Sequence, residues 1–267
     1  MMNKSILSAL GALAIFVLCS GFAPGVFTDP NASTVTGEIG IKGVGPMMGG
    51  LVFFYHAESG PPPSATKYWL VPAYSFKLDQ NSRFTAKLPE GTYYMGAIER
   101  SSGEALGPPA EGDYFFISSD KKGNPKMLTV WKNSVINLGL INEAEKFSRA
   151  SLAKKGITSV EGTIRDEEGK PVKGMAVYAY ATPEMLEKPL FVSDPSDQDG
   201  KYVLRVNRGG KYYLMARVGY GGGPLSPEEL AGVYKDGKPV SIKTGENRKG
   251  IHISVFKIIM SGHSHHF

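Results

Sequence analysis

The sequence has almost no cysteine. Cys19 is the only one among 267 residues, and it lies close to the N-terminus. No disulfide can therefore staple the rest of the chain, so its stability must come from the burial of apolar side chains. An apolar fraction of 42% is sufficient for that, because it is close to the value found in folded globular proteins.

Several signals of function are missing as well. The 30 Lys and Arg residues are dispersed without a run of five, so a formal charge of +5 does not indicate a nucleic-acid partner. There is no G-x-S-x-G or H-E-x-x-H motif, and no cysteine nucleophile after Cys19. His56 and His252, the histidines outside the C-terminal tail, both fall in expected strands without a catalytic partner. We therefore predict that the protein is not an enzyme.

The one long apolar run is Ile6–Leu18. It is shorter than the roughly 20 residues of a membrane-spanning helix, and it is typical of a secretory signal segment, here residues 1–23. Two endings remain open, cleavage after Ala23 or lipidation of Cys19 as in bacterial lipoproteins. Either ending predicts an exported protein, which is periplasmic, outer-membrane-associated or extracellular. Lipidation would add attachment to a membrane.

Glycine and aromatic residues are abundant, with 33 Gly, 18 Pro, 13 Tyr and 13 Phe. This composition indicates short strands separated by turns rather than helices. Residues 83–88 and 201–207 alternate apolar and polar side chains between Gly, Pro, Asn and Asp. Such a period of two predicts half-buried antiparallel strands.

Two parts of the sequence resemble each other. Residues 35–56, VTGEIGIKGVGPMMGGLVFFYH, and residues 160–181, VEGTIRDEEGKPVKGMAVYAYA, both start V-x-G-x-I and pass through a Gly/Pro turn into an apolar run. Residues 78–97 match residues 196–216 in the same way, through Asp, a turn, alternation and a Tyr-Tyr pair. This pattern predicts two copies of one unit. Each copy has about 100 residues, the size of a Greek-key β-sandwich.

In the second copy, V-x-G-x-I is followed by D-x-x-G-K-P-V-K-G at Asp166–Gly174 and later by G-x-Y-Y-L. This order resembles the carboxypeptidase regulatory-like domain, which is grouped with transthyretin-like (prealbumin-like) and Cna B-type sandwiches. The first copy has GVGPMMGG in place of the D-x-x-G-K-P turn. The resemblance implies an all-β chain with two tandem seven-stranded Greek-key sandwiches, at residues 33–140 and 158–258. It implies little about activity, because such modules occur as stalks, adhesins and carbohydrate-associated domains.

Residues 141–157 between the copies are expected to form a short, partly helical linker.

A second segment, Asp194–Gly200, has three aspartates and allows two interpretations. A calcium loop of the EF-hand type would also need a glutamate near its end, and there is none. We therefore interpret this segment as a hairpin turn closed by its own aspartate side chains.

Two long turn-rich segments occur at the same point in each copy, at residues 101–114 and 219–234. They are longer than a hairpin needs, and long loops on a rigid sandwich are where binding usually resides. One hypothesis is a recognition surface that uses Tyr114, Tyr220 and Tyr234. The alternative is that these tyrosines pack down onto the sandwich.

Trp69 follows a proline triplet in the segment 58–76. A tryptophan can stack on a sugar ring or anchor a protein partner. A tryptophan that follows a polar loop more often belongs to a core, so both roles stay open.

The C-terminal tail, residues 259–267, holds His263, His265 and His266. Imidazole is a common ligand of Zn, Cu and Ni, so the tail could bind a divalent transition metal. We expect the tail to be flexible, and three ligands on a flexible tail make a weak and unselective metal site. The alternative is a tail without function. No other cofactor is expected.

The sequence as a whole favours a non-catalytic exported protein. We expect a binding or scaffolding module that meets another envelope protein or a surface polysaccharide. The alternatives are metal binding through the tail and a carbohydrate-binding module that uses Trp69 and the tyrosines. The sequence does not indicate an oligomeric state.

Overall fold

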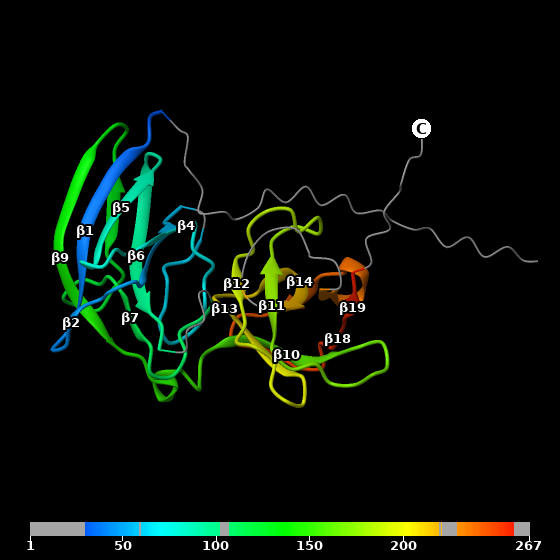
Figure 1. The fold of residues 1–267 in the computed structure, drawn as a ribbon. Coiled ribbons are helices and arrows are strands. Elements are labelled where there is room, and N and C mark those ends of the chain that lie inside the picture. Colours follow the sequence, from blue (N-terminus) through cyan, green and yellow to red (C-terminus); the bar gives the residue numbers. More distant parts are fainter. Residues whose placement is uncertain (1–29, 59, 102–106, 219, 221–228, 259–267) are drawn as a thin grey trace, which may run out of the picture.

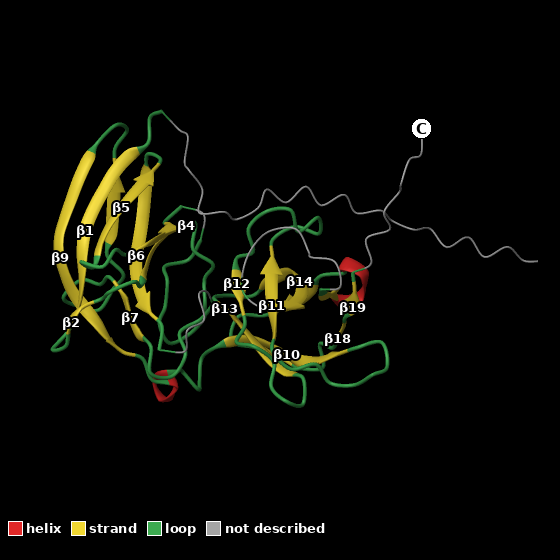
Figure 2. Ribbon diagram, viewed as in Figure 1, coloured by secondary structure: helices red, strands yellow, loops and turns green. Residues whose placement is uncertain are grey.

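The computed structural model describes residues 30–258, apart from residues 59, 102–106, 219 and 221–228. Within this part of the chain nearly every regular element is a strand, so the all-β prediction is confirmed (Figure 2). Two 3-10 turns, η1 (Arg149–Ser151) and η2 (Tyr234–Gly237), supply its helical residues. No described helix has the length and apolarity needed to cross a membrane.

The first half of the chain forms one curled sheet (Figure 1). Its order is β2-β1-β9-β7-β6-β3-β4, with β5 paired to β1 and β8 paired to β6. The strands are β1 (Ser33–Ile41), β2 (Gly45–Pro46), β3 (Leu51–His56), β4 (Tyr74–Lys77), β5 (Arg83–Leu88), β6 (Gly91–Glu99), β7 (Tyr114–Ile117), β8 (Met127–Val130) and β9 (Val135–Lys146).

This single sheet differs from the two separate sheets that a sandwich implies. β9 joins the layers, because it pairs in parallel with β1 over most of its length and antiparallel with β7 at its end. The β1–β9 register shifts after Thr36 and after Ile39, and Gly139 has φ +66°. Such irregularities bend a strand and increase its twist. β9 also continues to Lys146, inside the segment that the sequence predicted as a linker.

The second half forms two sheets. One has the order β13-β10-β17 with β18 also on β10, and the other has the order β12-β11-β14-β15-β19 with β16 on β14. The strands are β10 (Thr158–Arg165), β11 (Met175–Tyr180), β12 (Phe191–Val192), β13 (Lys201–Val206), β14 (Gly210–Val218), β15 (Leu230–Val233), β16 (Val240–Ile242), β17 (Asn247–Arg248), β18 (Ile253–Ser254) and β19 (Phe256–Lys257). β10 pairs antiparallel with β13 and parallel with β17 and β18, in the same senses as β1 pairs with β5 and β9.

The V-x-G-x-I motif has the same physical role in β1 and β10. Its apolar members are fully buried in both strands: Val35, Ile39, Val160 and Ile164. The glycine between them is a point of close approach. A Cβ on Gly162 would lie 1.7 Å from the carbonyl oxygen of Ile251, and a Cβ on Gly37 would lie 2.9 Å from the Phe84 ring. Tyr202 also donates its hydroxyl to the Ile251 carbonyl, at 2.7 Å.

Corresponding turns are closed by the same chemistry. Asp197 Oδ1 accepts the amide protons of Asp199 and Lys201, at 2.9 and 2.8 Å. Asp79 Oδ1 accepts two amide protons in the turn before β5, both at 2.8 Å. Asp197 therefore forms the aspartate-closed turn that we inferred for residues 194–200.

The close approach at Gly162 yields a stability prediction. Gly162→Ala should lower the free energy of unfolding by about 2–4 kcal/mol, because the added methyl group collides with backbone rather than with a movable side chain. Urea unfolding followed by circular dichroism measures this. Gly60→Ala is the matched control, since a Cβ there meets no atom within 4 Å, and it should change the value by less than about 0.5 kcal/mol. Equal stabilities of the two variants would contradict this account of the motif.

Candidate partner-binding surface

The two halves meet along the edge of β12. Val192 donates its amide proton to the Trp69 carbonyl, and Val71 donates its own to the Leu190 carbonyl, both at 3.2 Å. Leu70 forms an isolated antiparallel bridge with Phe191. β12 ends the strand order of its sheet, so a segment of the first half extends that sheet by one strand-like pairing. We call this junction of residues 68–73 with β12 the seam.

An apolar cluster fills the seam. Trp69 is 8% exposed and meets Phe147 edge to face, with ring centroids 5.7 Å apart. Phe115 also meets Phe147 edge to face, with ring centroids 6.1 Å apart. Buried residues of the second half complete the cluster: Ala176, Tyr178, Tyr180, Met185 and Val192. The sequence left two roles open for Trp69, and the structure shows the core role. Its ring has no open face for a sugar.

Polar contacts reinforce the seam on one side. Lys188 of the second half donates from Nζ to the backbone carbonyls of Ala73 and Pro72, the latter at 3.3 Å. Its ammonium group lies 5.8 Å from the centroid of the Tyr74 ring. His56 lies tilted against the Tyr93 ring nearby, at 4.9 Å between ring centroids. Burial lowers the pKa of His56, and the positive charge of Lys188 lowers it further.

A buried ion pair closes the base of the first long loop. Arg100 lies 3.1 Å from Asp113, whose side chain is fully buried. Asp113 also accepts the amide protons of Ser101 and Ala110, at 2.9 and 2.8 Å. Arg100 donates in addition to the carbonyl of Pro108, at 2.6 Å. These contacts tie Arg100 and Ser101 to residues 108–113, so they hold both ends of the loop together, although Arg100 Nε is buried without a hydrogen-bond partner.

The second long loop is closed in a related way. Arg217, near the end of β14, donates from Nε to Glu229, just before β15, at 3.1 Å. Both side chains are largely buried. Sequence reasoning missed these pairs, although a signal was present. In each copy an arginine stands at the start of the long segment and a carboxylate at its end.

The two loops come together at the seam. A Cβ on Gly107 in the first loop would lie 2.3 Å from the Tyr220 ring in the second, so the ring lies directly against that glycine. Tyr220 also donates its hydroxyl to the Ser193 carbonyl, at 3.0 Å. Two loops that are far apart in the sequence therefore share one contact.

A row of charges lies beside this contact. Glu111 of the first loop accepts the backbone amide proton of Arg149, at 2.6 Å. The Arg149 guanidinium lies 2.5 Å from the Asp194 carboxylate of the second half. The hydrogen bond that Arg149 donates to the Asp194 carboxylate raises the pKa of Arg149, with smaller contributions from Tyr220 and Glu111. The row thus runs from the first loop, through η1, to the second half.

The other predicted tyrosines are less accessible. Tyr234 is 8% exposed and belongs to the core of the second half. Tyr114 begins β7, is half-buried and packs against the core of the first half. Tyr114 and Tyr234 therefore match the alternative in which the tyrosines pack onto the sandwich. The predicted lipidation site Cys19 and the tail residues His263, His265 and His266 lie outside the described residues.

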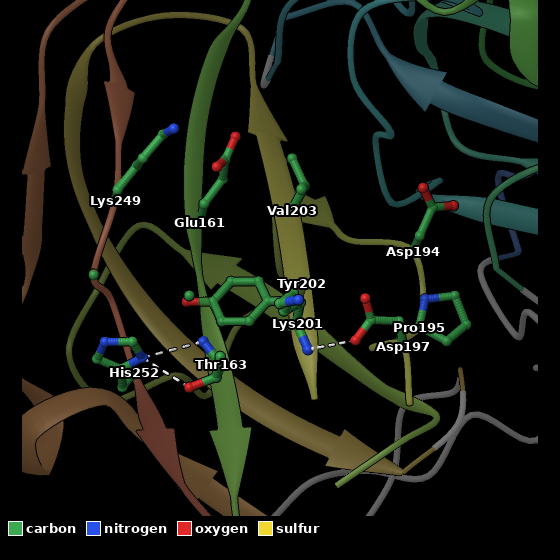
Figure 3. A pocket seen from close by; sticks show the side chains of 12 residues that line it. Glu161, Thr163, Asp194, Pro195, Asp197, Lys201, Tyr202, Val203, Lys249 and His252 are labelled. Carbon is green, nitrogen blue, oxygen red and sulfur yellow. Dashed lines mark hydrogen bonds between the residues drawn. The ribbon is translucent and has the colours of Figure 1, made fainter. Parts of the chain in front are cut away.

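A groove of about 470 Å³ lies on the outer face of β10 and β13 (Figure 3). It begins at Asp194 beside the seam and ends at His252. His252 precedes β18 rather than lying in a strand as the sequence predicted for it, and its side chain is exposed. Its Nδ1 lies 2.8 Å from the Thr163 hydroxyl and accepts the Thr163 amide proton at 3.3 Å. Within the described residues no group of three His, Cys, Asp or Glu is arranged to hold a metal ion.

No family model and no curated protein matches the sequence. Solved structures with detectable similarity include the Bacillus anthracis TIE protein, at 12% identity with a TM-score of 0.27. A streptococcal ancillary pilin follows at 15% and 0.23, and the shaft pilin SpaA from Lactobacillus rhamnosus GG at 10% and 0.23. These comparisons cover 85%, 86% and 85% of this chain, and 34%, 64% and 100% of the others. The chain thus spans about a third of the TIE protein, and the low TM-scores assign it to no family.

The seam yields a second prediction. Trp69→Ala should cost about 3–5 kcal/mol and split a single unfolding transition into two, because it removes the ring that packs the two halves together. Differential scanning calorimetry measures both effects. Trp131→Ala is the matched control, since Trp131 is 66% exposed, and it should leave one transition unchanged. A single, unshifted transition for Trp69→Ala would contradict the account of the seam.

His56 yields a prediction about pH. Its pKa in the folded protein lies below the ordinary histidine value of 6.5, so the unfolded chain binds more protons as the pH falls through that value. Stability that is present above about pH 6.5 is therefore lost on acidification. Chemical unfolding between pH 8 and pH 5 should show that His56→Gln loses less stability than the unaltered protein. Parallel pH profiles would refute this role of His56.

Proposed function

We propose that this chain is an exported, non-catalytic binding or scaffolding protein, built from two tandem transthyretin-like sandwiches. Its partner is another envelope protein or a surface polysaccharide. The contact surface is formed by the loops at residues 101–114 and 219–234, of which residues 102–106, 219 and 221–228 lie outside the described residues. The contact between Tyr220 and Gly107 is the observation that carries the proposal, because it joins both loops into one surface.

The physical basis is preorganisation. A binding loop that is already held in place loses less conformational entropy when its partner arrives. Both loops are tied at the base by arginine–carboxylate pairs, Arg100–Asp113 and Arg217–Glu229. The seam then supports the two loop bases relative to each other. A partner that contacts both loops would thus meet a composite surface that neither half provides alone.

The charges beside the loops favour a polar partner. Glu111, Arg149 and Asp194 alternate in sign along the row, and Glu111 and Arg149 are exposed. Alternating charges of this kind select a complementary partner and orient it more than they add affinity. The described aromatic rings of the region are buried or half-buried, so the carbohydrate-module alternative loses its main residue, Trp69. The metal alternative rests on the tail, residues 259–267, and on the sequence alone.

The proposal is tested by replacing residues 102–106 and 221–228 with two-residue Gly-Ser turns. The bases of the loops, with their ion pairs, stay intact in this variant. Affinity capture from detergent-solubilised envelope, and binding to a panel of surface polysaccharides, should each be compared with the unaltered protein. We expect a specific partner to be retained by the unaltered protein and lost from the double-loop variant.

The matched control replaces residues 121–124, the turn that Asp120 closes in the first half between β7 and β8. This control should retain the partner, and calorimetry should show that all three proteins fold. The same partners on the double-loop variant and the unaltered protein would overturn the proposed surface.

A further inference from the structure

One end of the first half is unexpectedly apolar. Trp131 and Val135 flank the turn between β8 and β9, and they are 66% and 80% exposed. Met127, which begins the edge strand β8, is 60% exposed as well. Lys132 stands between the two apolar side chains of the turn and is exposed as well. We call Trp131, Lys132 and Val135 the apolar tip.

The equivalent turn of the second half shows that the fold does not require apolar side chains at this end. β8 pairs with β6 as Val130 with Gly91, and β16 pairs with β14 as Ile242 with Gly210. Trp131 therefore corresponds to Lys243, the residue that follows Ile242.

The residue that follows the turn, at the start of β9, also has a polar equivalent in the second half. Val135 pairs with Thr34 in β1, and Asn247 pairs with Ser159 in β10. Val135 therefore corresponds to Asn247. At these two equivalent positions the first half has apolar side chains and the second half has polar ones. The apolar tip therefore needs an explanation other than folding.

The N-terminal part of the chain arrives at this tip. Asn133 donates its amide proton to the Asn31 carbonyl at 3.3 Å, and Ser33 donates its hydroxyl to the Trp131 carbonyl. The start of β1 and the turn before β9 accordingly lie at the same end of the molecule (Figure 1). Cys19, the predicted lipidation site, precedes Asn31 by twelve residues, a stretch that could extend at most about 40 Å.

We propose that the apolar tip contacts a lipid surface, to which a lipid on Cys19 brings it. Tryptophan prefers the boundary between headgroups and acyl chains, where its ring is buried and its N–H stays hydrated. Lys132 would lie among anionic headgroups, and a second cation, Lys87, is held nearby through Thr34 at 2.6 Å. The proposal rests on the export that we propose above and on lipidation of Cys19 rather than cleavage after Ala23, but not on the partner-binding loops.

The chain has two tryptophans, and this makes the contact measurable. Trp69→Phe removes the buried one and leaves Trp131 as the sole reporter. The full chain would be mixed with vesicles of phosphatidylethanolamine and phosphatidylglycerol, with and without brominated acyl chains. We expect the Trp131 emission to shift to shorter wavelength, to lose intensity to the brominated lipid and to become less accessible to acrylamide.

The matched control moves the reporter to the other half. In a Trp69→Phe, Trp131→Lys, Lys243→Trp variant the sole tryptophan occupies the equivalent position, and its emission should stay unshifted. The proposal is overturned if Trp131 is unshifted and unquenched while the chain sediments with the vesicles. It is equally overturned if the chain does not bind vesicles, or if both reporters are quenched alike.

The two proposals can fail separately. The capture experiment for the loops is carried out in detergent, where no lipid surface exists. The double-loop variant should still bring Trp131 into contact with vesicles, and Trp131→Lys should still capture the partner.

Discussion

The constraint on which the rest of the structure depends is the edge of β12, which the second half alone would leave unpaired. A strand of two residues at the end of a sheet leaves backbone groups without partners, which invites pairing with other chains. Here Trp69 and Val71 of the first half supply those partners. Tyr68 and Leu70 from the same segment pack against the core of the second half. The first half thus completes both a sheet and a core that belong to the second.

The loops gain their position from that junction. Each is closed by its own arginine–carboxylate pair, which fixes its base to its own half. The seam then brings the two bases together, so that Tyr220 reaches Gly107 and Arg149 reaches Asp194. Charge pairs and backbone hydrogen bonds, rather than exposed aromatic rings, therefore define the described part of this surface.

Some of this could be predicted from sequence because it depends on local rules. Alternation identified β5 and β13, and the aspartates of residues 194–200 identified the turn that Asp197 closes. The role of Trp69 could not be predicted, since burial there depends on an element more than 100 residues away. The continuous sheet of the first half was missed for a similar reason: its curvature comes from two register shifts and a glycine in β9, which no periodicity reveals.

Hydrogen exchange at the seam tests the central claim most directly. The amides of Val71 and Val192 donate across the junction, and no contact within one half protects them in the same way. If the halves form one unit, both amides should exchange as slowly as the core amides of β11 and β14, which open only on global unfolding. Exchange of Val71 and Val192 at the rate of open loops, with β11 and β14 still protected, would show that the halves separate freely and would contradict the account.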